Sequence, residues 1–243
     1  MQPDDTSVLV RSLTRRFGRF TAVDEISLGV KRGEIFGFLG ANGAGKTTAI
    51  RMLCGLLKPS EGEAWVGSLP VSRKPEAVKR NISYMSQKFS LYDDLTVQEN
   101  LTFYGGVYGL RNGQIRDRSA QLIEQLGLKD AGDNLTGSLP LGLKQRLALG
   151  SAALHRPPIL FLDEPTSGVD PVARRDFWDL IYTLAEEGST IFVTTHYMEE
   201  AEYCDRVSIM VRGRIVALGS PAELKDETGA NTMQDVFLET VKA

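Results

Sequence analysis

The chain has 243 residues, of which 42% are hydrophobic and 24% are charged, and its net charge is −3. That length allows one large domain or two small ones, with enough material for a buried core. Acidic and basic residues are interspersed along the chain. The composition therefore argues against a global electrostatic grip on nucleic acid, which favours a basic stripe.

The sequence carries no pattern typical of a membrane span or of secretion. No segment approaches the roughly 20 apolar residues that a membrane-spanning helix needs, and the acidic start, MQPDD, does not resemble a secretory signal. Cys54 and Cys204 fit neither a disulfide framework nor a CxxC metal pattern. We expect a cytosolic chain with idle or buried thiols, whose role at a membrane would come through a partner.

The first part of the chain is rich in strand signals. Weak alternation predicts strands over residues 8–13 and 26–30, and the continuous apolar run IFGFL predicts a buried strand at 35–39. A glycine-rich segment follows at once. Residues 47–53 then predict a helix, with Gly55 as its stop.

The middle of the chain, from about Leu95 to Arg156, is rich in helix signals. Thr96 with Glu99 three positions later fits a capping box at the start of a helix. Apolar residues at helical spacing predict two more helices, one over residues 116–126 and one over Leu143 to Leu154.

Strand signals return in the last part of the chain. Apolar runs predict buried strands at 159–162 and 190–194, with a helix over 175–184 between them. Residues 207–211 and 214–218 flank an Arg-Gly pair and predict a hairpin, and a polar tail with one or two short helices follows. Strands that alternate with helices predict an α/β fold whose mostly parallel sheet is covered on both faces.

Residues 40–48, GANGAGKTT, fit the P-loop pattern. Glycine lets the backbone fold around phosphate oxygens and direct its N–H groups at them, and the helix that follows adds the positive end of its dipole. Lys46 supplies a charge to the β- and γ-phosphates, and the Thr47 hydroxyl is a candidate Mg²⁺ ligand. A merely flexible loop is the alternative, but the segment lies between a buried strand and a helix, as a P-loop requires. The candidate nucleotide-binding residues here are Gly40, Asn42, Gly43, Ala44, Gly45, Lys46, Thr47 and Thr48.

An acidic pair, Asp163-Glu164, ends the apolar run that starts at Ile159. In open α/β sheets, ligands gather at the carboxyl ends of the strands. Asp163 is placed to hold Mg²⁺ through water, as a Walker B aspartate does, and Glu164 is the natural general base for the attacking water. An acidic pair after a strand is otherwise a solvated strand end or a helix cap. The P-loop favours the catalytic interpretation.

Together these motifs resemble the ATPase subunit of an ABC transporter, over about residues 8–224. Gln87 and the segment 91–101 resemble the family's Q-loop and its continuation. The resemblance implies that Gln87 senses the metal and the water, while the adjoining loop touches a membrane subunit. Residues 167–170, SGVD, resemble the D-loop, and His196 resembles the switch histidine. The implied catalytic set is Glu164, His196 and Gln87, and the implied metal set is Thr47, Gln87 and Asp163.

The resemblance also implies an aromatic contact and a domain plan. Phe17 is the residue expected to stack on adenine, with Phe20 as the alternative. The implied fold is a P-loop NTPase core with an N-terminal antiparallel β subdomain and an inserted α-helical subdomain, all in a single domain. The expected boundaries are 1–88 and 157–220 for the core, 89–156 for the helical subdomain and 221–243 for the tail.

The chain departs from the family at the signature motif. The family pattern is Leu-Ser-Gly-Gly-Gln followed by Gln-Arg, whereas residues 139–146 read LPLGLKQR. In this family two ATPase domains dimerise head to tail, and each signature closes over the opposite nucleotide. Pro140 lacks both a hydroxyl and an N–H, and Leu141 adds a side chain where glycine allows close approach. Gly142 remains as a candidate nucleotide contact.

Two hypotheses about the signature remain open. In the first, the altered signature contacts the nucleotide of the opposite domain only weakly. The chain then belongs in a natural heterodimer or is one half of a tandem protein. The alternative is that Gly142 and the end of its helix suffice.

The resemblance implies an ATP-hydrolysing subunit, with ATP and Mg²⁺ as cofactors, that powers a membrane transporter. Residues 91–101 and 236–239 are most similar to export-type ATPases, including drug-efflux systems. The expected partners are a transmembrane permease subunit and a second ATPase domain, with no nucleic acid, at the cytoplasmic face of the inner membrane. Two alternatives stay open: a soluble ABC-type ATPase acting on nucleic acid or ribosomes, and a nucleotide-sensing regulatory cassette with weak hydrolysis. Copurification with a membrane protein would separate the first of these from a transporter motor.

Overall fold

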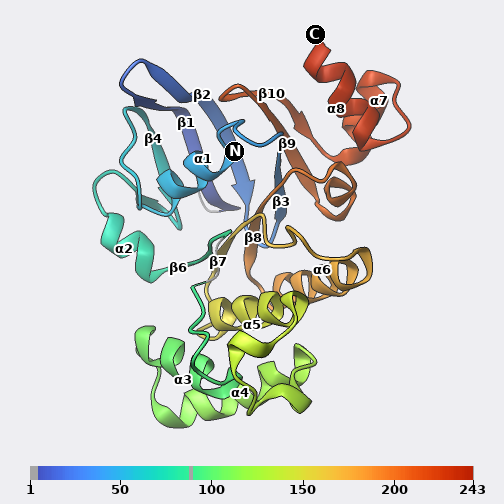
Figure 1. Cartoon of the computed structure of the whole chain (residues 1–243). Coiled ribbons are helices and arrows are strands. Elements are labelled where there is room, and N and C mark those ends of the chain that lie inside the picture. Colours follow the sequence, from blue (N-terminus) through green and yellow to red (C-terminus); the bar gives the residue numbers. More distant parts are fainter. Residues whose placement is uncertain (1–4, 88–89, 243) are drawn as a thin grey trace.

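The computed structural model describes residues 5–87 and 90–242. Its strands form two sheets, and Figure 1 shows the helices grouped around them, with the green helical segment below the central sheet. Among the described residues, no helix combines the length and apolarity that crossing a bilayer requires.

The first sheet is antiparallel and has the strand order β2-β1-β4-β5. Its strands are β1 (Thr6–Phe17), β2 (Phe20–Lys31), β4 (Glu61–Val66) and β5 (Leu69–Pro70). The expected N-terminal antiparallel unit is therefore present. Its first two strands are longer than the alternation of apolar residues predicts, because they continue past the buried stretch into an exposed hairpin.

The second sheet is mostly parallel and has the order β10-β9-β3-β8-β7-β6. All neighbouring strands run parallel except the hairpin of β9 and β10 at one edge, which confirms the predicted hairpin. The strands are β3 (Ile35–Leu39), β6 (Ile82–Met85), β7 (Ile159–Asp163), β8 (Thr190–Thr195), β9 (Arg206–Val211) and β10 (Arg214–Gly219).

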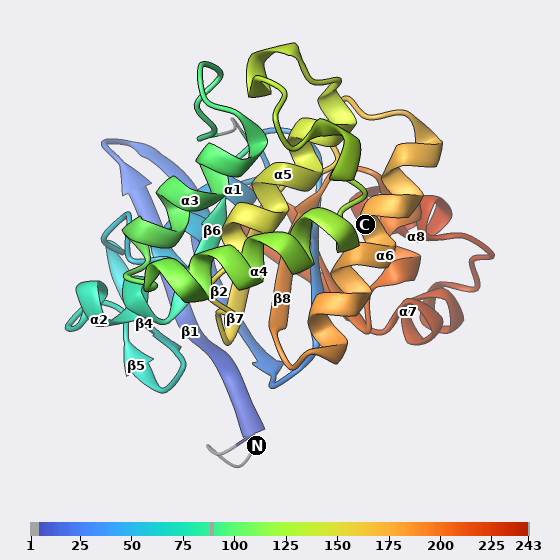
Figure 2. The same cartoon turned by 90° about the horizontal axis from the view of Figure 1, so that it is seen from below.

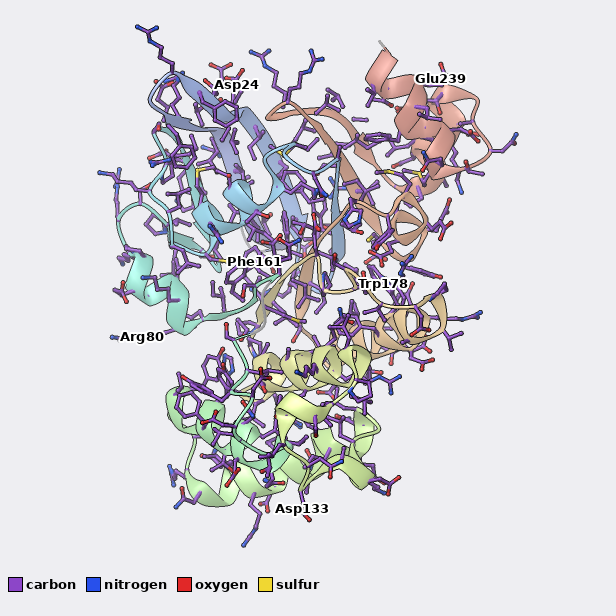
Figure 3. The ribbon with its side chains drawn as sticks, in the orientation of Figure 1. Asp24, Arg80, Asp133, Phe161, Trp178 and Glu239 are labelled. Atoms are coloured by element: carbon purple, nitrogen blue, oxygen red, sulfur yellow. The ribbon has the colours of Figure 1, made fainter. Side chains whose placement is uncertain are left out.

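Both faces of the central sheet are covered, as the apolar strands predict. Phe161 and Phe192 face one core, which the sheet shares with α1 (Lys46–Leu53) and the antiparallel sheet. Leu160 and Ile191, on the other face, meet α5 (Leu141–Ala153) and α6 (Pro171–Glu186). Figure 3 labels Phe161 and, in the second core, Trp178.

A third core holds the helical segment together. It lies between α3 (Val97–Val107), α4 (Asn112–Gln125) and α5, which Figure 2 shows stacked across the sheet. The predicted capping box is confirmed, since the Thr96 hydroxyl accepts from the Glu99 N–H and the Glu99 carboxylate accepts from the Thr96 N–H.

The remaining helices with described bounds are short. The tail forms two of them, as predicted, and the others lie elsewhere. They are α2 (Pro75–Arg80), η2 (Lys129–Ala131), η3 (Thr136–Ser138), η4 (Met198–Tyr203), α7 (Pro221–Thr228) and α8 (Met233–Lys242).

Three predicted helix starts are wrong, because each helix begins before its first apolar repeat. The start predicted at Arg175 lies at Pro171, where the Asp170 side chain accepts 3.0 Å bonds from two N–H groups of the first turn. Proline is pre-organised for a first helical position, and such a cap is worth about 1 kcal/mol. α4 and α5 likewise begin early, at Asn112 and Leu141.

The apolar pattern does not predict four elements between residues 61 and 85, which are β4, β5, α2 and β6. β4 buries only Ala64 and Val66 and begins with exposed Glu-Gly-Glu, so its alternation is too short to detect. α5 also differs from the expected amphipathic helix. Residues 147–153 are buried all round because the helix lies between the sheet and the helical segment.

Both cysteines are buried, as expected, and burial raises the pKa of each thiol well above its ordinary value.

The partly buried ring of His155 generates a prediction about stability at low pH. It stacks on Tyr108 with ring centroids 3.7 Å apart, and burial lowers its pKa from 6.5 to about 4. Below pH 6.5 the unfolded chain takes up a proton that the folded chain accepts only near pH 4. The free energy of unfolding therefore falls as the pH drops through this window.

The substitution His155→Phe keeps an aromatic ring against Tyr108 but removes the titrating group. We expect the variant to lose less stability than the parent chain between about pH 7 and pH 5, measured by urea denaturation. All other groups titrate alike in the two proteins, so an equal loss in both would contradict the assignment.

Candidate nucleotide-binding and hydrolysis site

The P-loop lies between β3 and α1 and needs glycine for a steric reason. Gly45, just before α1, has φ +110°, and a Cβ atom there would lie 2.4 Å from the carbonyl oxygen of Ala22. Only glycine adopts this conformation without strain and leaves room for the neighbouring backbone. The loop leads directly into the N-terminus of α1, and the N-terminus of a helix suits an anion.

Lys46 is buried within this loop. Its ammonium donates to the carbonyl oxygens of Gly40 at 2.7 Å and Ala41 at 3.2 Å, and lies 3.1 Å from Glu164 Oε1. Its side chain is 3% exposed and that of Glu164 is 7% exposed, so each charge depends on the other to offset the cost of leaving water. The structure thus brings the predicted phosphate-binding cation directly to the predicted general base.

Asp163 is held by three hydroxyl groups at the end of β7. Its Oδ1 accepts from Thr47 at 3.1 Å and from Thr194 at 2.7 Å, and its Oδ2 accepts from Tyr84 at 3.2 Å. Hydrogen bonds to a charged acceptor are each worth about 1.5–3 kcal/mol. The carboxylate is therefore fixed beside the Thr47 hydroxyl, and these two hard oxygen ligands are of the type that Mg²⁺ prefers.

Tyr84 remains a hydrogen-bond donor over the whole physiological range. Burial, together with the nearby charge of Asp163, raises the pKa of Tyr84 to about 12. Neither Tyr84 nor Thr194 stands out in the sequence as a site residue. A phenol before the Q-loop and a threonine at the end of a strand have no distinctive spacing.

Glu164 is the point at which three predicted residues meet. Besides Lys46, its carboxylate accepts from Gln87 Nε2 at 3.2 Å and lies 3.1 Å from His196 Nδ1. A carboxylate only accepts, so Nδ1 is the protonated nitrogen of His196 in this contact. The structure therefore gathers Gln87, Glu164 and His196 into one cluster, and their catalytic roles stay predictions.

The backbone of Glu164 adopts a left-handed conformation, with φ +49°. Such a conformation costs a non-glycine residue of the order of 1–3 kcal/mol and persists where its surroundings enforce it. Here its N–H donates to both the carbonyl oxygen and the hydroxyl of Thr194, at 3.1 and 3.0 Å. β8 thus holds the strained turn that aims the Glu164 side chain at the P-loop.

A cavity of about 480 Å³ opens beside these groups. This volume lies in the range of small-ligand sites. Its lining consists of Phe20, Ala22, Asn42, Gly43, Gly45, Lys46, Thr47, Thr48, Gln87 and Glu164.

The aromatic residue at this cavity is Phe20, the alternative, and not the expected Phe17. Phe20 is 64% exposed and lines the cavity. Phe17 pairs with it across the hairpin, but its ring is covered by the guanidinium of Arg15 at 4.5 Å and lines no part of the cavity. The sequence pattern could not separate the two, because they lie on neighbouring strands at the same hairpin end.

Gly142 lies away from this cavity, in the first turn of α5. A Cβ at Gly142 would lie 3.4 Å from Ala173 of α6, and Leu141 reaches within 3.4 Å of a Cβ at Gly168 in the D-loop segment. The structure therefore places the signature beside the D-loop of its own chain. A contact between Gly142 and a nucleotide on another domain stays a prediction.

The fold and the site define a nucleoside triphosphate-binding protein with a P-loop core. A family model described as "ABC transporter" matches residues 23–167. A second model, described as "AAA domain, putative AbiEii toxin, Type IV TA system", matches residues 136–200. The chain belongs to the ABC transporter family and contains its ATP-binding domain.

Curated relatives have names that refer to drug transport or resistance. The chain is 48% identical to the "Probable multidrug ABC transporter ATP-binding protein YbhF" of Escherichia coli (strain K12), over 98% of this chain and 42% of that protein. It is 37% identical to the "Linearmycin resistance ATP-binding protein LnrL" of Bacillus subtilis (strain 168), over 91% of this chain and 72% of the relative. It is 40% identical to the "Daunorubicin/doxorubicin resistance ATP-binding protein DrrA" of Streptomyces peucetius, over 91% of this chain and 68% of that protein. The chain thus spans less than half of YbhF.

Solved structures agree with the fold over nearly the whole chain. An ATP-binding subunit of an ABC transporter superimposes with a TM-score of 0.87 at 26% identity, over 97% of this chain and 100% of that one. The protein cbiO1 from Clostridium perfringens superimposes with a TM-score of 0.83 at 31% identity, over 92% of each chain.

The hydroxyl of Thr194 generates a prediction about metal dependence. The substitution Thr194→Val keeps the shape of the residue but removes the 2.7 Å bond to Asp163 and one of the two acceptors of the Glu164 N–H, leaving the Thr194 carbonyl oxygen as the other. Loss of a group that orients a metal ligand typically costs between about 10-fold and 100-fold in metal affinity. We expect the Mg²⁺ concentration needed for half-maximal binding of a fluorescent ATP analogue to rise by that factor.

A matched control is Thr190→Val, at the opposite end of the same strand. Thr190 is equally buried, and its hydroxyl bonds to Ser7 and to the Gly33 N–H rather than to the site. The two variants should lose similar thermal stability. A Thr194→Val protein with the same Mg²⁺ response as the control would contradict the proposed role.

Proposed function

We propose that this chain binds ATP with Mg²⁺ and hydrolyses it to power a membrane transporter, in the direction of export. The observation that carries the proposal is the convergence on Glu164. One buried carboxylate contacts the P-loop lysine, the Q-loop glutamine and the switch histidine within 3.2 Å, next to the Thr47–Asp163 pair.

In the proposed mechanism Lys46 and the P-loop N–H groups bind the β- and γ-phosphates. Thr47, Asp163 and, through its amide, Gln87 are the residues that would hold Mg²⁺, which neutralises charge on the phosphoryl oxygens when bound. The ammonium of Lys46 exchanges its contacts to Gly40 O, Ala41 O and Glu164 for phosphate oxygens. This exchange frees a Glu164 oxygen for the attacking water.

Glu164 then acts as the general base. It accepts a proton from water as the water oxygen bonds to the γ-phosphorus and the bond to the bridging oxygen of ADP breaks. His196, whose Nδ1 lies 3.1 Å from Glu164 Oε2, orients the carboxylate. Phe20 at the cavity mouth is the better placed aromatic side chain for a stack on adenine.

Export is supported by the names of the relatives, which refer to multidrug transport or to resistance against linearmycin, daunorubicin and doxorubicin. Coupling to a transmembrane permease needs a docking surface near the Q-loop. A small pocket of about 40 Å³ beside β6, lined by Tyr84, Met85, Ser86, Ser90, Leu91, Tyr104, Tyr108 and three residues of α5, marks the surface near the Q-loop. We propose that the permease subunit docks there and that the chain works on the cytoplasmic face of the membrane.

The second partner is another ATPase domain. The exposed signature end at Leu141 lies outside the cavity of its own chain, so a nucleotide contact by this segment requires a second domain. Because the chain spans 42% of YbhF, a tandem protein with two cassettes is compatible with the comparison, as is a heterodimer.

Removal of the proposed base tests hydrolysis directly. Glu164→Gln preserves the size of the side chain but not its proton affinity. We expect ATP to bind and stay trapped, while turnover falls by about 10²–10⁴-fold, the range of general-base catalysis. The measurements are phosphate release and retention of radiolabelled ATP.

Glu186→Gln, at the exposed end of α6, is the control for a lost negative charge. A nucleotide-sensing regulator without hydrolysis makes the opposite prediction. In that case the Glu164 variant would bind and release nucleotide as the parent chain does, and the proposal would be wrong.

The altered signature generates a second test, in the full assembly with its partner domain. Pro140→Ser with Leu141→Gly restores the hydroxyl, the N–H and the close approach at the start of α5. Serine is also a favourable helix cap, so the helix should persist. We expect ATP turnover to rise by about tenfold or more, because one well-placed donor to a developing oxyanion is worth at least that factor.

The single variant Leu141→Gly separates close approach from the missing serine. Unchanged turnover in the double variant would favour the alternative, in which Gly142 and the helix end suffice.

A further inference from the structure

A buried carboxylate lies behind the hydrolysis cluster. Glu200, in η4, is 0% exposed. Its Oε1 accepts a 2.5 Å hydrogen bond from the Thr166 hydroxyl and lies 3.6 Å from Nε of Arg174. A charge buried this deeply is retained only when it is paired and hydrogen-bonded. Thr166 and Arg174 both contact Oε1, whereas Oε2 is buried without a hydrogen-bond partner.

The Thr166–Glu200 hydrogen bond lies close in sequence, on both chain segments, to the contact between Glu164 and His196. Thr166 follows Glu164 by two residues, and Glu200 follows His196 by four. The segments therefore meet twice, once at the 3.1 Å contact of Glu164 with His196 and once at Thr166 with Glu200. A second fixed point so near the first limits how far the side chains of Glu164 and His196 can move apart.

Arg174 extends this link to the D-loop segment. Its guanidinium stacks on the ring of Tyr197, beside His196, at 3.8 Å, and donates to the carbonyl oxygen of Val169 at 3.4 Å. The D-loop turn itself closes on the site, since the Ser167 N–H donates to the carbonyl oxygen of Glu164. The ion pair of buried Glu200 with partly buried Arg174 thus links the D-loop segment to the segments that carry Glu164 and His196.

We propose that Glu200 is a positioning residue for ATP hydrolysis, which sets the distance between Glu164 and His196 and fixes the D-loop through Thr166 and Arg174. This inference rests on the proposed function. Glu200 does not line the cavity and does not contact the reacting groups directly. Its effect falls on the rate of the chemical step rather than on ATP binding.

The test compares Glu200→Gln with Glu199→Gln in the full chain. Glutamine keeps an oxygen for Thr166 but removes the charge that faces Arg174. Glu199 is the preceding residue on the same 3-10 turn and is exposed, so it is a matched control for the loss of one carboxylate. We expect kcat to fall between about 10-fold and 100-fold for Glu200→Gln, the cost of a small misplacement of reacting groups, with KM for ATP within about twofold.

A second readout does not depend on turnover. Hydrogen exchange of the Ser167 and Val169 N–H groups, which bond to Glu164 and Thr166 carbonyl oxygens, reports on the D-loop turn by mass spectrometry. We expect faster exchange in Glu200→Gln and no change in Glu199→Gln. Arg174→Lys, which keeps the charge but not the planar stack on Tyr197, should show an intermediate loss of kcat.

The outcomes separate the possible failures. Unchanged kcat and unchanged exchange in Glu200→Gln would overturn the inference. So would a parallel loss of kcat and ATP affinity with a lowered melting temperature, because that pattern marks a merely structural role. If the parent chain itself failed to hydrolyse ATP, the proposed function would be wrong, and the exchange comparison alone would decide whether Glu200 holds the two segments together.

Discussion

The structure depends on one arrangement, the burial of the Glu164 carboxylate against the Lys46 ammonium at the edge of the central sheet. Neither charge is stable there alone, since an unpaired buried ion costs several kcal/mol. Glu164 also carries backbone strain, which its N–H bonds to Thr194 hold in place. The site is therefore set up in advance at the expense of local stability, as expected where geometry matters more than fold stability.

Strand order explains why motifs so distant in sequence meet at this point. In the order β3-β8-β7-β6, the strands lead at their carboxyl ends into the P-loop, the switch histidine, the acidic pair and the Q-loop glutamine, respectively. Parallel neighbours place all four ends on one edge of the sheet. The contacts of Glu164 with Lys46, Gln87 and His196 are thus a consequence of topology, and the two packed faces of the sheet keep that edge rigid.

The sequence predicts the parts of this arrangement that depend on spacing or on continuous apolar runs. The P-loop, the strands of the central sheet and the capping box at Thr96 belong to this group. It does not separate Phe17 from Phe20, because one hairpin turn decides which ring faces the cavity. Nor does it reveal Thr194 or Glu200, whose roles arise from contacts across strands and turns. Such contacts leave no local pattern in the chain.

The signature end and the hydrolysis site of the same chain are connected, although each is expected to act on a different nucleotide. Gln145 of α5 donates to the carbonyl oxygen of Ser167 at 3.2 Å, and the D-loop turn that contains Ser167 closes on Glu164. A shift of α5 when the signature meets another domain would therefore move the D-loop, and with it Glu164, the proposed base. Pro140 leaves α5 intact as a helix. If the altered signature contributes less to the opposite nucleotide, as we propose, the chain would still keep this mechanical link, and a second cassette with a full signature would complement it.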